Sequence, residues 1–166
     1  MLNSKKYYTY WSNGKSDPMY VSTTDNNGYG YEITTAMKYY NTKVESGSKY
    51  TILPVKQLTD NMTASTGSGN SGWYIPTSAE WAKMLTCLGN GSTPASTLSK
   101  LSTWIKAMDG SEGLYSYNYY WSCQEASVSS WNTAVYMNAN ASAAGATPAQ
   151  TRSKSETAYV RPFLAF

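Results

Sequence analysis

The chain carries its strongest local signal in the stretch Gly72-Trp73-Tyr74-Ile75-Pro76-Thr77-Ser78-Ala79-Glu80-Trp81. Thr77 and Glu80 have the spacing of a capping box, in which each side chain accepts a hydrogen bond from a backbone N–H that would otherwise be unpaired. Apolar residues then follow at helical spacing, and a glycine marks the end: Trp81, Met84, Leu85, Leu88 and Gly89. The stretch predicts a short extended segment that leads into an amphipathic helix.

Two further helices are predicted, one on each side of this stretch. The upstream helix starts at a Thr34 cap, and its apolar face consists of Ile33, Ala36, Met37, Tyr40 and Val44. The downstream helix has Thr93 as its cap and Pro94 at its first position. It ends at Asp109-Gly110, and its inward residues are Leu98, Leu101, Ile105 and Met108.

Strands are predicted elsewhere from β-branched and aromatic residues between turn signals. They cover residues 6–11 and 19–21, with a β-rich segment at 50–55. Residues 63–72 are small and polar, which is typical of a long surface loop. No internal repeat is visible, and 166 residues with 41% hydrophobic content are enough for one core, so we expect a single domain over residues 1–166.

Charge and hydropathy exclude two classes of partner. The net charge is only +3, and Lys5-Lys6 is the sole adjacent basic pair, so the sequence predicts no nucleic-acid partner. No apolar run approaches the roughly 20 residues that a spanning helix needs, and the N-terminus lacks the apolar region of a signal peptide. We therefore expect no membrane span.

The residue types available leave little room for catalysis or metal binding. The chain has no histidine, which removes the usual general base and metal ligand, and only ten carboxylates. Asp25-Asn26-Asn27-Gly28 lacks the spaced acids of a calcium loop and is interpreted as a turn. Cys87 and Cys123 are interpreted as core thiols, and whether they form a disulfide is left open. The sequence predicts no catalytic residue, no metal and no cofactor.

Three segments carry a resemblance to a known superfamily. Residues 72–81 are similar to the G-W-x-[LI]-P-T-x-x-E-[WL] element of the formylglycine-generating enzyme superfamily, and Tyr120-Trp121-Ser122-Cys123-Gln124-Glu125 resembles its Y-W-S-S-T-E element. The ending Tyr159-Val160-Arg161-Pro162-Phe163-Leu164-Ala165-Phe166 resembles the V-R-P-V-L-A-F ending of one branch. That branch is similar to the variable proteins of diversity-generating retroelements.

The resemblance implies a fold and a function. It implies an α+β C-type lectin fold, with two or three helices around a mixed, mostly antiparallel sheet with long loops. It also implies that residues 113–166 form the variable, ligand-binding segment, because in such systems an error-prone copy made at adenines replaces the 3′ end of the gene. Mutated Asn-type codons yield residues such as Asn, Tyr, Ser, Thr, Ala and Val, but never Trp or Met, so Trp131 and Met137 are assigned to the scaffold.

Strand geometry adds a second criterion for the binding residues. If residues 133–140 form a strand, Val135, Met137 and Ala139 face the core, and the alternate residues face solvent. Tyr, Asn and Ser on such a face suit adaptable recognition, although any single Tyr among the 16 could equally be an ordinary strand residue. The predicted ligand-binding residues are Tyr115, Tyr117, Gln124, Ala126, Ser127, Val128, Ser129, Ser130, Asn132, Ala134, Tyr136, Asn138 and Asn140.

Several prominent residues have a structural interpretation. Trp121 and Trp131 are expected in the core. Arg161 is expected to be buried or partly buried beside a carboxylate, for which Glu125 is the candidate. Tyr119, the tyrosine nearest to Trp121, is expected to be packed, whereas Tyr115 and Tyr117 are expected at the surface.

The expected partner is a protein or glycan receptor on a host or neighbouring cell, and the expected setting is a phage particle or a bacterial surface.

Two alternative functions remain. A fixed-specificity, metal-independent lectin or adhesin domain would share the scaffold; calcium-dependent sugar binding is disfavoured because Trp131-Asn132-Thr133 lacks the usual acid. A formylglycine-generating-type oxidase would need a copper-binding cysteine pair near the C-terminus, where this chain has only Cys123. The oligomeric state is left open.

Overall fold

The computed structural model describes residues 7–10, 30–44, 52–61, 72–89, 100, 102–103, 106–107, 118–126, 132–139 and 147–165. In chain order they form β1 (Tyr7–Tyr10), α1 (Gly30–Val44), α2 (Leu53–Asn61), β2 (Gly72–Tyr74), α3 (Ser78–Gly89), β3 (Asn118–Glu125), β4 (Thr133–Ala139), β5 (Thr147–Ser153), β6 (Thr157–Val160) and β7 (Phe163–Ala165). The predicted α+β class is therefore confirmed.

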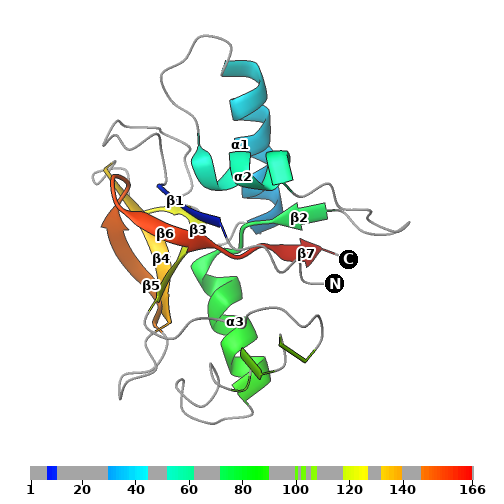
Figure 1. Ribbon diagram of the computed structural model, residues 1–166, viewed down its shortest axis with the longest axis vertical. Coiled ribbons are helices and arrows are strands. Elements are labelled where there is room, and N and C mark those ends of the chain that lie inside the picture. Colours follow the sequence, from blue (N-terminus) through cyan, green and yellow to red (C-terminus); the bar gives the residue numbers. More distant parts are fainter. Residues whose placement is uncertain are drawn as a thin grey trace.

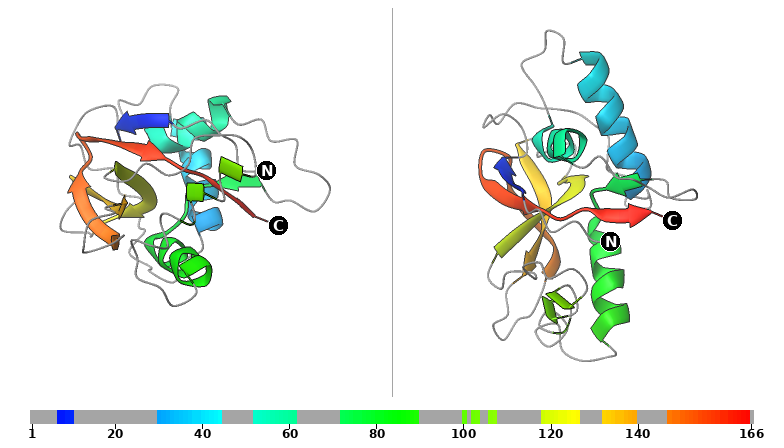
Figure 2. Two further views of the ribbon diagram at one scale, coloured as in Figure 1. Left: turned by 60° about the horizontal axis from the view of Figure 1, so that its bottom comes forward. Right: turned by 45° about the vertical axis from the view of Figure 1, so that its right-hand side comes forward.

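Five strands form one sheet in the order β1-β6-β3-β4-β5, and β2 pairs with β7 in a separate two-stranded sheet. Paired strands are antiparallel except β3 and β6, which run parallel with Tyr120 opposite Tyr159. Helices α1 and α2 lie on one side of the larger sheet and α3 on the other (Figures 1 and 2). Central strands of this sheet are consequently covered on both faces.

Each side of the sheet has its own apolar cluster. On the α1 and α2 side, Met37, Val55 and Leu58 belong to the cluster that contains Trp121. On the α3 side, Trp81 and Leu85 pack with Tyr120, Met137 and Ala139. The scaffold interpretations of Trp121 and Met137 are confirmed, since both side chains are fully buried.

The two cysteines are free, and only one of them is in the core. Cys123 is buried and Cys87 is exposed on α3, so the prediction of a core thiol at Cys87 is wrong. Trp81 and Leu85 bury one stripe of that helix. At about 100° per residue, Cys87 lies some 200° beyond Leu85 and therefore faces solvent.

Helix α3 begins as its capping box predicts. The Thr77 N–H donates to Glu80 Oε2 at 2.8 Å, and the Glu80 N–H donates to Thr77 Oγ1 at 3.1 Å. Helix α1, in contrast, begins at Gly30 rather than at a Thr34 cap. Thr34 is a buried interior residue whose hydroxyl donates to the Ile75 carbonyl and accepts from the Ile75 N–H. It ties α1 to the segment after β2.

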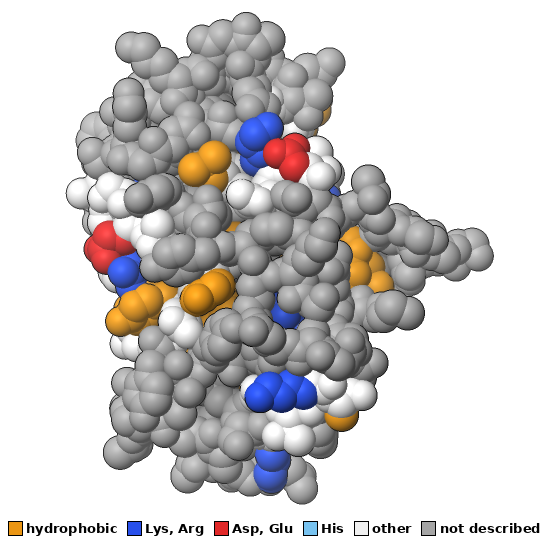
Figure 3. Space-filling view, in the orientation of Figure 1, with side chains coloured by type: hydrophobic (Ala, Val, Ile, Leu, Met, Phe, Trp, Pro, Cys, Tyr) orange, Lys and Arg blue, Asp and Glu red, His pale blue; other side chains and the backbone are white. Residues whose placement is uncertain are grey.

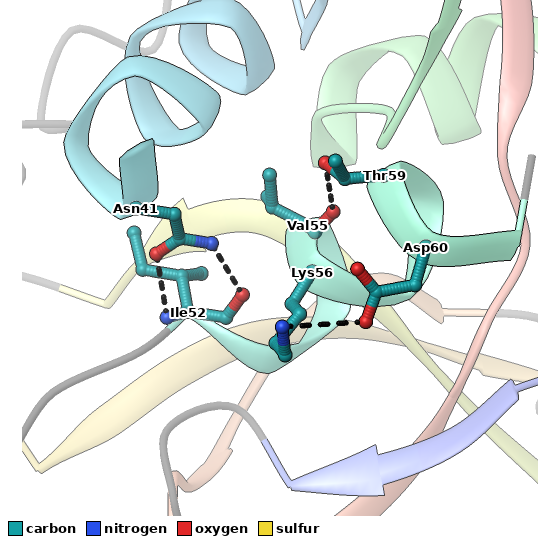
Figure 4. Close-up of polar contacts among 6 residues, drawn as sticks. All are labelled: Asn41, Ile52, Val55, Lys56, Thr59 and Asp60. Atoms are coloured by element: carbon teal, nitrogen blue, oxygen red, sulfur yellow. Dashed lines mark hydrogen bonds and ion pairs between the residues drawn. The ribbon is translucent and has the colours of Figure 1, made fainter. Parts of the chain in front are cut away.

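Helix α2 covers residues 53–55 of the β-rich segment predicted at 50–55, so the prediction is wrong for these residues, while residues 50 and 51 lie outside the described part. The side-chain amide of Asn41 in α1 donates to the Ile52 carbonyl and accepts from the Ile52 N–H, so Ile52 is paired with a side chain immediately before the helix (Figure 4). Pro54 is tolerated in the first turn because the N–H it lacks has no intrahelical partner there. Val55 and Leu58, three residues apart, then enter the core.

Strand β3 contains an irregularity that positions the site. Trp121 lies opposite Tyr136 and Glu125 lies opposite Ala134, so four steps along β3 match only two along β4. Such a bulge bends the strand and frees backbone groups for other partners. The Cys123 N–H donates to the Pro76 carbonyl at 3.0 Å, directly before α3.

Other predicted elements are covered in part. The strand at residues 6–11 corresponds to β1. In the third predicted helix, Lys100, Ser102, Thr103, Lys106 and Ala107 are helical, whereas its predicted inward residues lie outside the described part. The strand at 19–21, the loop at 63–71 and Trp131 also lie outside it.

Candidate functional site

The three segments that carry the superfamily resemblance meet in space. Strand β2, from the first segment, pairs with β7, from the last, with Trp73 opposite Leu164. Trp81 packs against Phe163 at 5.0 Å between ring centroids and against Tyr120 at 6.0 Å. Segments up to 93 residues apart in the chain, from Gly72 to Ala165, therefore form one packed frame.

Glu80 is the polar centre of this frame. Besides capping α3, its carboxylate accepts from the N–H of Gly30, at the start of α1, at 3.1 and 3.3 Å. A side chain at position 30 would place its Cβ 2.4 Å from Glu80 Oε2 and 2.6 Å from the Ile75 carbonyl, so glycine is required there. Burial, together with the Glu80 charge and a hydrogen bond to it, raises the pKa of Tyr74 to about 12.

Gln124 belongs to this frame and not to a ligand-binding surface. Its Oε1 accepts from both the N–H and the hydroxyl of Ser78, each at 2.8 Å, and its side chain is 2% exposed. The bulge in β3 turns Gln124 toward α3, which the strand pattern could not indicate. The assignment of Gln124 to the binding residues is therefore wrong. We call Gly30, Thr77, Ser78, Glu80 and Gln124 the helix-start junction.

The loop between β3 and β4 is closed at its base by three contacts. The Ala126 N–H donates to the Thr133 carbonyl at 3.2 Å, and the Lys154 N–H donates to the Asn132 carbonyl at 2.8 Å. Lys154 Nζ also forms a buried ion pair with Glu125 Oε1. None of these three contacts uses a side chain from residues 126–132.

This pairing corrects one prediction. The carboxylate of Glu125 pairs with Lys154, on the turn between β5 and β6, rather than with Arg161. The predicted burial of Arg161 is confirmed, at 2% exposure. Lys154 was overlooked because no pattern in the turn distinguishes it from a solvated lysine.

A second polar cluster lies on β3, β4 and β5. The Tyr136 hydroxyl donates to Gln150 Oε1 at 2.8 Å, and Asn138 Nδ2 donates to the same oxygen at 3.2 Å. The ring of Tyr119 meets that of Tyr136 edge-on, with centroids 5.1 Å apart. Burial and the neighbouring Tyr119 raise the pKa of Tyr136, while Arg152 acts in the opposite direction.

Arg152 completes this cluster. Its guanidinium carbon lies 4.1 Å from the centroid of the Tyr119 ring, a cation–π geometry. Its Nη2 pairs with Glu156 Oε2 at 2.7 Å, with 19% of the Arg152 side chain and 50% of the Glu156 side chain exposed. We call Tyr119, Tyr136, Asn138, Gln150 and Arg152 the tyrosine patch.

The patch lies at the rim of the molecule. In Figure 3, acidic and basic groups adjoin at the left-hand rim, with hydrophobic side chains beside them, in the region where Figure 1 places β5 and its turn into β6. Within the patch, Tyr119, Asn138 and Gln150 are half-buried, whereas Tyr136 is buried in the cluster with Trp121.

The predicted binding residues divide into three groups. Tyr136 and Asn138 lie together in the tyrosine patch, whereas Ala126 and the exposed Asn132 lie at the loop end of β3 and β4, roughly 17 Å away along the strand. Gln124 and Ala134 are buried, and so is Tyr136, which is 9% exposed and belongs to the cluster with Trp121, so its prediction as a solvent-facing residue is wrong. The remaining members lie outside the described part of the chain: Tyr115, Tyr117, Ser127, Val128, Ser129, Ser130 and Asn140.

Ala134 contradicts the assumption of one exposed face on β4. It is fully buried in the cluster with Trp121 and Met37, while Met137 and Ala139 are buried on the α3 side. Because helices cover both faces of the sheet, alternation does not distinguish core from surface on this strand. Its assignment to the binding residues is wrong, and Val135, predicted in the core, is only half-buried.

Sequence patterns did not indicate three residues of the patch, Tyr119, Gln150 and Arg152. Residues 149–152 read Ala-Gln-Thr-Arg, an alternation that places Gln150 and Arg152 on one face of a strand. That signal was available but weak, because the segment has few of the β-branched and aromatic residues that identify strands.

The described residues do not assemble an evident catalytic or metal centre. Burial, with the Glu80 charge as a smaller cause, raises the pKa of Cys123 well above its ordinary value, so its thiol is a poor nucleophile. Within the described ranges, no group of three or more His, Cys, Asp or Glu residues is arranged to hold a metal ion. None of the helices in that part of the chain has the length and hydropathy needed to cross a bilayer.

Comparison with known proteins identifies a fold relative only. No protein-family model matches the chain, and no curated protein matches it. Among solved structures, a fimbrial protein from Bacteroides ovatus ATCC 8483 has a similar fold, with a TM-score of 0.65 and 18% sequence identity. The similarity covers 99% of this chain but 35% of that one, so the chain spans about a third of the length of that protein.

Proposed function

We propose that this chain is a ligand-binding variable protein of the kind diversified by retroelements, on a C-type-lectin-like scaffold, with residues 113–166 as the variable segment. The proposal includes no catalytic step. The ligand would be a receptor on a host or neighbouring cell, and the setting a phage particle or a bacterial surface.

The observation that carries the proposal is the separation between frame and surface within this segment. The residues that resemble the superfamily motifs, such as Trp121, Gln124 and Arg161, are buried in the frame. Asn132 and Asn138 lie between or beside them with exposed or half-exposed side chains. Substitution at the second kind of position costs little stability, which is what a diversified surface needs.

The test is to sequence the gene with its flanking DNA. We expect a reverse transcriptase and a near-identical template, with mismatches at template adenines. The mismatched codons should include those for Asn132, Asn138 and residues 127–130, and should spare Gln124 and Ala134. A locus without a template, or with mismatches spread over the frame codons, contradicts the proposal.

A fixed-specificity, metal-independent adhesin or lectin domain is the second candidate. The fold similarity to a fimbrial protein favours this candidate, because a shared fold gives no indication that the chain is diversified. A gene without a template, whose product binds one ligand unchanged by chelating agents, would support it.

A formylglycine-generating-type oxidase is the third candidate, and the burial of Cys123 disfavours it. Copper titration with a thiol-oxidation assay tests it, since any turnover would establish an enzyme.

A further inference from the structure

The tyrosine patch holds hydrogen-bond donors in fixed positions. Gln150 Oε1 is occupied by the Tyr136 hydroxyl and by Asn138 Nδ2, so the Gln150 amide is held with its carbonyl toward these two residues and its NH2 group directed away from them. The Arg152 guanidinium is restrained by its cation–π contact with Tyr119 and by its ion pair with Glu156. Donors that are oriented before binding lose little entropy when a ligand arrives.

Arg152 already holds a carboxylate of this chain. Its Nη2 donates to Glu156 Oε2 at 2.7 Å, and the Glu156 side chain is half exposed. A guanidinium has five N–H donors in one plane and suits carboxylates, while an exposed ion pair contributes little stability. Glu156 therefore occupies a position that an external carboxylate could share or take at little cost.

We propose that the tyrosine patch binds an acidic saccharide, with the sugar carboxylate on Arg152 and sugar hydroxyls on Gln150 and Asn138, while the buried Tyr136 holds the Gln150 amide in place. The inference rests on the proposed ligand-binding function and names its ligand class. Glu156 acts as an internal competitor for the sugar carboxylate.

A saccharide fits better than an acidic protein partner. Amide groups both donate and accept, which matches sugar hydroxyls, whereas a glutamate side chain would use Arg152 alone. A stable protein partner also needs about 800 Å² from each side, more than a patch of five side chains offers.

The experiment measures binding of sialyllactose and trigalacturonic acid by calorimetry on the whole chain, with lactose and methyl-esterified trigalacturonate as neutral counterparts. We expect binding of the acidic sugars only. Arg152→Gln should weaken it about tenfold or more, and Glu156→Gln should strengthen it up to about fivefold, because the competitor is removed. Lys56→Gln is the control, since it removes an equal charge from the Lys56–Asp60 pair on α2.

The opposite effects of the Arg152 and Glu156 variants separate ligand contact from structural support. If the ion pair only stabilised β5, both variants would weaken binding, and the inference would be wrong. Equal binding of acidic and neutral sugars, or binding of a hexaglutamate peptide without any sugar, would also overturn it. Should Arg152→Gln fail to fold, Arg152→Lys and Glu156→Gln provide the same contrast.

Failure of this inference is distinguishable from failure of the proposed function. An adenine-mismatched template beside the gene with no preference for acidic sugars refutes the saccharide assignment alone. A gene without a template whose product prefers acidic sugars refutes diversification, and leaves the fixed-specificity lectin.

Discussion

The helix-start junction and the tyrosine patch are both made of polar side chains, yet they differ in how those groups are partnered. In the junction, the Glu80 carboxylate accepts from Thr77 and Gly30, and Gln124 accepts twice from Ser78. In the patch, Gln150 and Arg152 have donors left for a ligand, and the Arg152–Glu156 pair is partly exposed. Buried polar groups need every partner, whereas exposed ones can exchange partners with water or ligand.

The two ion pairs next to the β5–β6 turn show the same contrast within a few residues. Lys154 and Glu125 are buried, so removing one partner leaves a charge without its counterion. In the second pair, the Glu156 side chain is half exposed and the Arg152 side chain is partly exposed. Stability should therefore depend more on the first pair than on the second.

Lys154→Met should have the largest effect, a loss of about 3–5 kcal/mol in the free energy of unfolding, because Glu125 is left buried without its counterion. The double variant Glu125→Gln with Lys154→Met should recover part of that loss. Urea unfolding measures both, with Arg152→Gln as the exposed-pair control, expected within about 1 kcal/mol of wild type. Similar losses for Lys154→Met and Arg152→Gln would remove the contrast between the pairs.

Gln124→Leu should cost about 1–3 kcal/mol, since it leaves the Ser78 N–H without its acceptor. Ligand binding, measured on the same variant, should fall only in proportion to the loss of folded protein. If binding falls while stability is unchanged, Gln124 belongs to the surface after all.

Tyr74 should contribute a smaller, pH-dependent effect. Its pKa is raised from 10.0 to about 12 in the folded state, so between pH 10 and 12 the unfolded chain loses this proton first. Stability is therefore lost as pH rises through that window. Unfolding curves from pH 9 to 12 should fall more steeply for wild type than for Tyr74→Phe, and parallel curves would contradict the assigned burial.

Asn138→Ser should have the smallest effect, within about 0.5 kcal/mol, because the half-exposed side chain can exchange Gln150 for water. Thermal unfolding checks this, with Ala139→Ser as the buried neighbour that should lose clearly more. Equal losses at the two positions would mean that the patch is part of the frame.

The sequence predicted correctly those features whose signals lie within a few consecutive residues. The capping box is complete within four residues, so Thr77 and Glu80 predicted the start of α3 correctly. The segment at 50–55 was predicted as β because of its composition, but the Asn41 contact that pairs Ile52 comes from another helix. Tyr136 and Asn138 were assigned to a polar face, while their partner Gln150 lies on a strand that the composition did not reveal.

By itself, the sequence determined the α+β class, the start of α3 and the burial of Trp121, Met137 and Arg161, because helix caps and large side chains carry their preferences locally. Only the tertiary structure decided that Glu80 also binds Gly30, that Glu125 pairs with Lys154 and that Ala134 is inside. These outcomes depend on which element lies above each face of the sheet and on a bulge in β3. Both follow from packing between segments far apart in the chain, which residue spacing does not encode.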